Sequence, residues 1–249
     1  MKKRDKKIEK KRKRSNAKKW AQSNQKDSVP YIKKQDGIEL FKIEKEGTVS
    51  VDILPFIASS KNKNAKEGYE HYETEYETHD VTINSKFKRT LCRGFFKKKC
   101  AFCEFIKNNR NNEDVDPEIL YGYRPKTRHL WFINDNPGKV KNFKIKIFDT
   151  GHFNQGIGFG ELLIQEISSK DDVTNFWFPE KGKILDLRIA KKTIGNKRPY
   201  YFVNRIDFRK RIKNYSADLA SQMPCLDDFL IDPGYEEVEN MIKLDNCEE

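Results

Sequence analysis

The sequence lacks long hydrophobic runs. No apolar stretch approaches the roughly 20 residues that a membrane-spanning helix requires, and the lysine-rich start MKKRDKKIEKKRKR is followed by no hydrophobic segment of the kind that a secretory signal carries. Hydrophobic residues make up only 36% of the chain and charged residues reach 35%, so part of the chain is expected to be solvated. We therefore expect a cytoplasmic protein with no membrane partner.

Cysteine and histidine are also scarce. The 249 residues include five cysteines and four histidines, and three of the cysteines fall between positions 92 and 103. In a reducing compartment, clustered cysteines favour a metal site over a set of disulfides. Cys225 and Cys247 stand apart from the cluster, and we expect them to be free thiols.

Positive charge is abundant but unevenly distributed. The formal net charge is +12; residues 1–35 hold 15 lysines and arginines against 3 acidic residues, whereas residues 216–249 hold 1 against 10. A basic arm at 1–35, disordered or helical only on binding, and an acidic tail at 216–249 on a basic body indicate a polyanionic partner, nucleic acid first. A coding bias toward lysine would explain the composition but not this segregation.

The pattern of apolar residues predicts a mainly β protein. Period-two alternation indicates strands at 38–44, 49–58, 69–83, 183–190 and 199–208, and a pair of strands within 129–151 joined by a turn at 136–139. Within the body of the chain, helices are expected at 103–112 and 159–168. Many short strands with few helices favour a small barrel or sandwich, with an insertion around the cysteines.

Four residues have the spacing of a structural zinc site: His79, Cys92, Cys100 and Cys103. The C-x-x-C pair lets two sulfurs face one ion, and the other two residues complete a tetrahedron. His71 is the competing histidine and lies further from the cysteines along the chain. A redox dithiol is one alternative. A catalytic deaminase zinc is another, but the sequence lacks the glutamate after the histidine and the proline before the C-x-x-C pair.

Cations alternate with aromatic rings in two later segments, LYGYRPKTRHLWF at 120–132 and KRPYYFVNRIDFRKR at 197–211. Single-strand binders need this mixture, because cations follow the phosphates and flat rings stack on unpaired bases. Some of these rings must instead be core, since a strand alternates its faces. For Trp131 the two interpretations are equally supported. Tyr121 and Tyr123, in an expected loop, favour stacking. Tyr200 and Phe202 should lie on the opposite face of a strand from Tyr201, and one of these two sets should be buried.

The histidine and cysteine spacing, the YGYRPKTRHLWF segment and KVKNFKIKIFDTG together resemble the zinc-containing, helix-destabilising single-stranded DNA-binding proteins of T-even and related tailed phages. The similarity covers roughly residues 38–209. It implies an OB-fold barrel at 36–215 with a zinc subdomain inserted at about 66–125, single-stranded DNA in the cleft between them, and no enzymatic activity. It also implies a role in phage replication, recombination and repair in the cytoplasm of the infected bacterial host.

Three sets of residues carry expected roles under this resemblance. The zinc ligands are His79, Cys92, Cys100 and Cys103. The DNA contacts are Lys88, Arg89, Arg93, Lys97, Lys98, Tyr121, Tyr123, Arg124, Lys126, Arg128, Trp131, Tyr200, Tyr201 and Arg205. Self-association along the strand, which makes binding cooperative, is assigned to Lys11, Arg12, Lys13, Arg14 and Ser15. The acidic tail is expected to recruit replication and recombination proteins and to hold a short docked helix.

Two other functions are left open by the residues. A metal-dependent nuclease or deaminase would need an open coordination position and a general base, for which Glu104 and Asp80 are the candidates. An RNA-binding zinc-ribbon protein would fit the basic composition, although three cysteines and a distant histidine suit a ribbon poorly.

Overall fold

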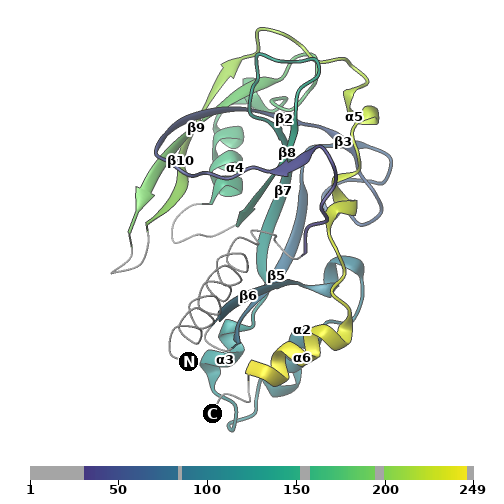
Figure 1. The fold of residues 1–249 in the computed structure, drawn as a ribbon, viewed down its shortest axis with the longest axis vertical. Coiled ribbons are helices and arrows are strands. Elements are labelled where there is room, and N and C mark those ends of the chain that lie inside the picture. Colours follow the sequence, from purple (N-terminus) through teal and green to yellow (C-terminus); the bar gives the residue numbers. More distant parts are fainter. Residues whose placement is uncertain (1–30, 84–85, 152–157, 194–198, 246–249) are drawn as a thin grey trace, which may run out of the picture.

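Eight strands form one mixed sheet that runs through the computed structural model, which describes residues 31–83, 86–151, 158–193 and 199–245 (Figure 1). Its strand order is β1-β8-β7-β2-β9-β10, with β5 and β6 attached through β7. All pairs are antiparallel except β1 with β8. The strands are β1 (Ile38–Leu40), β2 (Gly47–Leu54), β5 (Thr74–Ile83), β6 (Lys86–Leu91), β7 (Lys126–Asn134), β8 (Ile145–Gly151), β9 (Lys183–Lys192) and β10 (Tyr200–Lys210).

Strand β7 joins two parts of the molecule. One edge of β7 pairs with β8, while the other edge pairs with β5 over residues 126–130 and with β2 over residues 132–134. The strands β3 (Phe56–Ile57) and β4 (Glu70–His71) form a separate two-stranded sheet beside the large sheet. Among the described strands the pairings do not close into a ring. The mainly β class is confirmed, and the predicted OB-fold barrel is not.

Alternation along β7 feeds two separate hydrophobic cores. Leu130 and Phe132 point into a core shared with the segment 215–230, whereas Trp131 and Ile133 point into a core covered by α4 (Phe159–Ser169). Successive side chains of a strand face opposite sides of the sheet, so a strand that is buried on both faces carries a continuous apolar run. The sequence LWFI is such a run.

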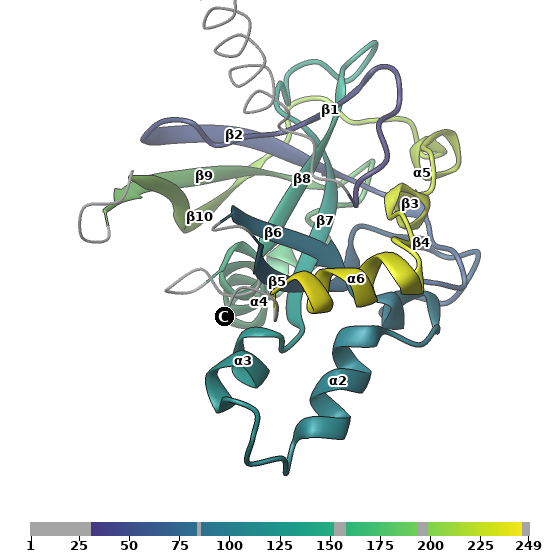
Figure 2. The same cartoon turned by 60° about the horizontal axis from the view of Figure 1, so that its bottom comes forward.

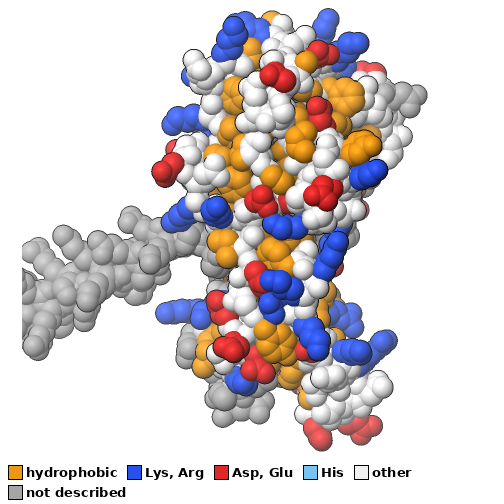
Figure 3. All heavy atoms as spheres, turned by 90° about the vertical axis from the view of Figure 1, so that its right-hand side faces the viewer, with side chains coloured by type: hydrophobic (Ala, Val, Ile, Leu, Met, Phe, Trp, Pro, Cys, Tyr) orange, Lys and Arg blue, Asp and Glu red, His pale blue; other side chains and the backbone are white. Residues whose placement is uncertain are grey.

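The acidic C-terminal segment is built into the fold. It contains α5 (Leu219–Gln222), the 3-10 turn η3 (Leu226–Phe229) and α6 (Tyr235–Asp245). The fully buried carboxylate of Asp227 accepts hydrogen bonds from Thr74 Oγ1 at 2.6 Å and Asn62 Nδ2 at 3.0 Å. Figure 3 shows Lys and Arg side chains mixed with Asp and Glu over the side of the molecule that carries α5 and α6. Most of the expected tail is therefore a structural element, and its expected docked helix is α6.

A smaller part, here called the metal lobe, lies below the main sheet in Figure 1. It consists of the far ends of β5 and β6, η1 (Arg93–Phe96), α2 (Ala101–Asn109), α3 (Pro117–Gly122) and α6. Figure 2 shows α2, α3 and α6 grouped around this end of the sheet. The core of the lobe includes Val81, Ile83, Phe102, Val238 and Ile242. The apolar stripe of α6 at Val238, Met241 and Ile242 explains how a helix with an acidic first turn docks here.

The predicted strands and helices agree with the structure only in part. Strand β6 was not predicted, the strand predicted at 38–44 ends at Leu40, and the strand predicted at 69–83 is interrupted between β4 and β5. Pro55 separates β2 from β3 in the stretch predicted as one strand at 49–58, since proline lacks the donor a ladder needs. Helix α2 begins at Ala101, two residues before its predicted start. The stretch before β7 contains α3, which was predicted as loop: Asp116 accepts a hydrogen bond from the Glu118 amide at 2.8 Å, and Pro117 holds the first helical position.

Candidate metal centre and nucleic-acid interface

The four predicted metal ligands converge from three elements. His79 lies on β5, Cys92 directly follows β6, and Cys100 and Cys103 lie at the start of α2. Their ligand atoms all fall within 4.8 Å of one another, and all but Cys103 are buried. The local fold explains this convergence, because the β5–β6 pairing sets His79 opposite Thr90 and so brings Cys92 beside it.

The distances fit a tetrahedral ion. A zinc with bonds of about 2.3 Å to sulfur and about 2.0 Å to nitrogen separates its sulfurs by about 3.8 Å and sulfur from nitrogen by about 3.6 Å. Here Cys92 Sγ and Cys103 Sγ are 3.6 Å apart, and His79 Nε2 lies 3.4 Å from Cys100 Sγ and 3.7 Å from Cys103 Sγ. The site can therefore hold a metal ion, and its donor set is consistent with zinc.

A second layer of contacts orients the histidine. His79 Nδ1 lies 2.7 Å from the backbone carbonyl oxygen of Tyr123 and donates to it, so Nε2 faces the sulfurs and is the nitrogen that would bind a metal ion. The imidazole also stacks on Phe102 with ring centroids 4.9 Å apart. These contacts fix the tautomer that a metal ligand requires.

The electrostatics of the site favour a cation. Burial opposes charge on His79, but hydrogen bonds with Cys100 and Cys92 outweigh it and raise the pKa of His79 to about 10. Hydrogen bonds from Cys103 and Cys92 lower the pKa of the Cys100 thiol, while contact with Cys100 raises the pKa of Cys92. These shifts favour a thiolate at Cys100 beside a protonated His79. A metal ion would take the place of the protons, because coordinating thiols bind as thiolates.

The other candidate ligands lie elsewhere. His71 is on β4, where it pairs with Phe56 and its ring is tilted against that of Tyr72, and it is not in the cluster. Cys225 is a half-buried free thiol beside Asp227. The preference for His79 over His71 is confirmed by this geometry, and Cys247 lies outside the described residues.

Several cations of the segment between the ligands Cys92 and Cys100, here called the metal loop, have partners within the fold. Arg93 Nε donates to Asp232 at 2.7 Å, and Lys98 Nζ lies 2.8 Å from the same carboxylate. Lys97 is exposed, with Nζ 3.5 Å from the Ser60 carbonyl oxygen. Arg93 and Lys98 therefore tie the metal loop to the chain just before α6, which is a structural role that the sequence does not distinguish from DNA contact.

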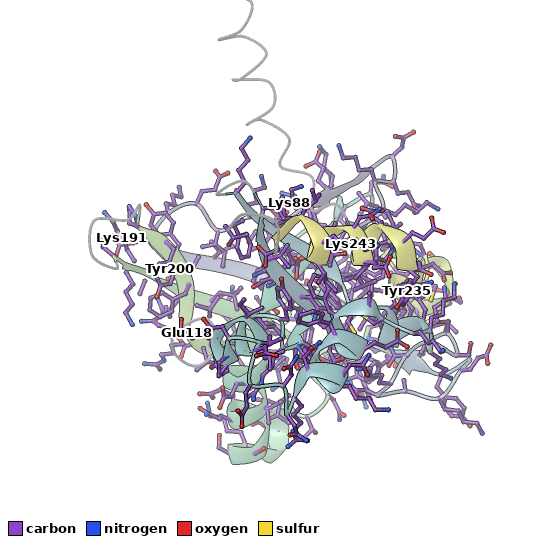
Figure 4. All side chains as sticks on the ribbon, turned by 90° about the horizontal axis from the view of Figure 1, so that it is seen from below. Lys88, Glu118, Lys191, Tyr200, Tyr235 and Lys243 are labelled. Atoms are coloured by element: carbon purple, nitrogen blue, oxygen red, sulfur yellow. The ribbon has the colours of Figure 1, made fainter. Side chains whose placement is uncertain are left out.

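Lys88 lies on the α6 side of the metal lobe. It is exposed and opposite Val81, which packs in the lobe core with Val238. In Figure 4, Lys88 is labelled toward the Lys243 end of α6, whereas Lys191 and Tyr200 mark the projecting end of β9 and β10. Lys88 is thus on the opposite face of β6 from Arg89.

Two of the predicted stacking rings are buried instead. Trp131 is 1% exposed and donates from Nε1 to Thr150 at 3.1 Å. Tyr123 is 2% exposed; its carbonyl accepts from His79 and its hydroxyl donates to Asp245. The prediction of a stacking role for Tyr123 is wrong, because the turn that ends α3 points its ring into the metal lobe. Tyr121 is 70% exposed, with the Arg124 guanidinium 5.2 Å from its ring centroid.

Three predicted cations share one face of the sheet. The registers place Arg89 opposite Asp80, and Lys126 and Arg128 opposite Thr78 and Tyr76, so alternation directs these side chains to the same side. Asp80 binds Arg89 Nε at 2.6 Å and Lys126 Nζ at 2.9 Å. Burial raises the pKa of Asp80, but these two cations outweigh burial and lower it. We call Arg89, Lys126 and Arg128 the cationic face.

The cationic face leads to a hollow of about 380 Å³ between β8, α4 and β10. Arg128 lies at its edge, held by Asp149 at 2.7 Å. Tyr201 comes from the late predicted segment and Lys42 from the chain after β1. The hollow therefore brings together residues from both aromatic and basic segments, and its aromatic lining consists of Phe41, Phe148, Phe159, Tyr201 and Phe202.

The three consecutive aromatic residues of the second cationic and aromatic segment are all half-buried. Tyr200, Tyr201 and Phe202 are all of intermediate exposure, so neither face of β10 is fully buried there. Tyr200 and Phe202 share a face with ring centroids 5.9 Å apart, as the alternation predicts. The expectation that one set would be buried is wrong, since this stretch lies at the projecting end of β9 and β10. Arg205 is exposed and pairs with Asp207 at 2.7 Å.

The sequence analysis missed Phe41, Lys42 and Phe87. Phe87 is 63% exposed on β6 between two lysines. An apolar residue amid charges in a strand gives the period-two signal of a buried face, so its exposure was not predictable from the pattern. The predicted self-association residues Lys11, Arg12, Lys13, Arg14 and Ser15 lie outside the described residues.

A comparison with known proteins finds no family model and no curated protein that matches the chain. Among the helices of the described ranges, none combines the length and the apolar character that crossing a bilayer demands.

Proposed function

We propose that the protein binds single-stranded DNA without strong sequence preference and performs no catalysis. The observation that carries this proposal is the cationic face and its continuation into the aromatic hollow. Phosphates can follow Arg89, Lys126 and Arg128, and unpaired bases can stack on rings of the hollow such as Tyr201. The described structure offers this surface on a sheet rather than on a projecting helix, which suits a single strand better than a duplex groove.

The metal would serve the fold. Zinc, held by His79, Cys92, Cys100 and Cys103, would be a structural ion, since four protein ligands fill its coordination and no position is left for water. The two nearby carboxylates are also committed: Glu104 accepts a hydrogen bond from Tyr235 at 2.7 Å, and Asp80 is bound by Arg89 and Lys126. This supports a binding protein over a nuclease or a deaminase.

The finer parts of the proposal come from the resemblance to the phage single-stranded DNA-binding proteins. They are an OB-type body with an inserted zinc subdomain, cooperative self-association through Lys11 to Ser15, and action in replication, recombination and repair in the infected host. Partner recruitment by the acidic segment would use its exposed carboxylates, because most of its apolar side chains pack in the cores.

A strand-selectivity assay tests the proposal. Fluorescence anisotropy with labelled oligonucleotides of equal length should give tighter binding to single-stranded DNA than to duplex, and log affinity should fall with log salt at a slope near −0.7 per phosphate contacted. Affinity that does not change with salt would contradict it. The same samples, incubated with Zn²⁺ or Mg²⁺ and resolved on a gel, should release no product. An RNA arm decides between DNA and RNA as the preferred strand.

A further inference from the structure

A phenylalanine at the outer end of the cationic face has no role in the core or at the metal centre. Phe87 lies on β6 opposite Thr82, and 63% of its surface is exposed. Alternation along β6 directs its ring to the same face as Arg89. A single exposed apolar residue is common on protein surfaces, so the argument depends on what surrounds this ring.

A guanidinium holds the ring from one side. The Arg89 guanidinium carbon lies 5.2 Å from the Phe87 ring centroid, within the range of a cation–π contact. Arg89 is itself fixed, because Asp80 accepts from its Nε at 2.6 Å and from its Nη2 at 3.0 Å. The ring therefore has a fixed support beneath it while most of its surface faces solvent.

There is room beside the ring for a flat ligand. Phe87 borders a hollow of about 280 Å³ that is also lined by Thr82, Gly122 and Lys126, a space equivalent to several water molecules at about 30 Å³ each. Thr82 is exposed and Gly122 has no side chain, so neither blocks the approach. Lys126 and the carboxylates Asp80 and Asp245 line the hollow, and Arg89 lies beside it against the Phe87 ring. Asp80 is paired with both cations, and Asp245 accepts a hydrogen bond from the Tyr123 hydroxyl.

We propose that Phe87 is a stacking platform for one unpaired base of a single-stranded nucleic acid, with Arg89 and Lys126 contacting the phosphates that flank this base. This inference rests on the proposed function and deepens it. The two cations beside the ring and the open space next to it suit a flat base with flanking phosphates. A paired base cannot offer its face to the ring without unstacking, so the platform favours single strands over duplex.

The test is Phe87→Leu, measured by anisotropy with a labelled oligonucleotide and with an abasic strand of the same length. Loss of one stacked base should weaken binding to the normal strand by about 5- to 150-fold and leave the salt slope unchanged. The abasic strand should bind wild type and variant alike. Phe87→Tyr should keep wild-type affinity, and unchanged metal content should accompany every variant because the side chain is exposed.

Tyr69→Leu is the matched control. Tyr69 is 60% exposed and also lies under a cation, with Lys66 Nζ 5.4 Å from its ring, but it is in the loop before β4 and away from the cationic face. This variant should bind as wild type does.

The outcomes separate the two claims. Wild type that binds with the expected salt slope, together with an equal affinity of Phe87→Leu, overturns the platform alone. An equal loss of affinity for the abasic strand also overturns it, because no base is there to stack. Wild type that binds no strand overturns both the platform and the proposed function.

Discussion

The body of the molecule and the metal lobe are held together by different forces. The body has two cores, one beneath each face of its sheet, built from large side chains such as Phe56, Phe132 and Trp131. The lobe core has nine buried residues, and two of them are the ligands Cys92 and Cys100. Burial of a large apolar side chain contributes about 1.5–3 kcal/mol, so the body can fold by burial alone, whereas the lobe has few such residues.

Because the lobe core is small, the metal ligands and the contacts of helix α6 stabilise the same elements. The contacts of α6 with the lobe are the apolar pair Val238 and Ile242 and the hydrogen bonds from Tyr235 to Glu104 and from Tyr123 to Asp245. Every one of these partners lies on an element that also carries or supports a metal ligand. We therefore expect order in the lobe to depend on a bound metal ion, and four experiments compare the lobe with the body.

Removing the metal should have the largest effect. Structural zinc sites contribute an apparent 10–16 kcal/mol at neutral pH, so a chelator should unfold the lobe. Hydrogen exchange followed by mass spectrometry should show loss of protection in α2 and α6, with protection kept in β9 and β10. Cys100→Ser should reproduce this pattern. Cys225→Ser, a cysteine outside the cluster, should retain full metal content; equal exchange with and without chelator would refute the dependence.

Shortening a body side chain should destabilise the whole protein. Phe229 is buried in the first core and packs edge-on to Phe132 with ring centroids 5.5 Å apart. Phe229→Ala should lower the free energy of unfolding by about 3–5 kcal/mol, as measured by urea denaturation. Ile231→Ala, two residues away and exposed, should cost far less. Similar losses in both variants would mean that the 226–230 segment is not the core element described.

Removing one cation should weaken strand binding slightly. Lys126→Gln should reduce affinity for single-stranded DNA at low salt and make the log–log salt slope shallower by about 0.7, because one phosphate contact is lost. Lys243→Gln on α6, where Lys243 pairs with Glu239, should leave the slope unchanged. A slope unaltered by Lys126→Gln would remove this residue from the interface.

Acid should have the smallest effect, through a histidine of the body. Burial lowers the pKa of His71 below 6.5, although Glu73 and Asp227 oppose the shift. Below about pH 6.5, His71 therefore binds a proton more readily in the unfolded chain than in the folded chain. The free energy of unfolding falls as the pH drops through this range, by less than about 1.4 kcal/mol per pH unit. Urea midpoints at pH 7 and pH 5.5 should differ less in His71→Gln than in wild type. Equal differences would assign the effect to other groups.

Much of the body was predictable because the spacing of the apolar residues and the positions of the turn residues indicate the same elements there. The runs in which apolar and polar residues alternate correspond to β7, β8, β9 and β10, and the run with a 3.6-residue apolar period corresponds to α4. The metal centre was predictable from spacing because soft ligands are rare in the chain and appear together. Helix α3 was missed since it is short, although Asp116 and Pro117 are a capping signal.

The proposed nucleic-acid interface was only partly predictable, because composition does not reveal which residue each charged side chain pairs with. Arg93 and Arg89 are both arginines near the cysteines and both bind an aspartate, yet the partner of Arg93 is Asp232 of the C-terminal segment whereas that of Arg89 is Asp80 on the cationic face. Asp232 is distant in sequence, so only the folded chain shows the pairing. For the same reason the acidic segment looks like a tail in the sequence, although Asp227 and Phe229 are buried.

The strand β7 has one more consequence. It carries Lys126 and Arg128 near the lobe and Phe132 in the body, and over its nine residues it spans roughly 30 Å without interruption. A continuous strand paired with β8 leaves no joint at which the two parts could swing. The separation between Phe87 and Tyr201 is therefore set by backbone geometry, and a bound polynucleotide would have to adjust its own stretch and curvature to reach both.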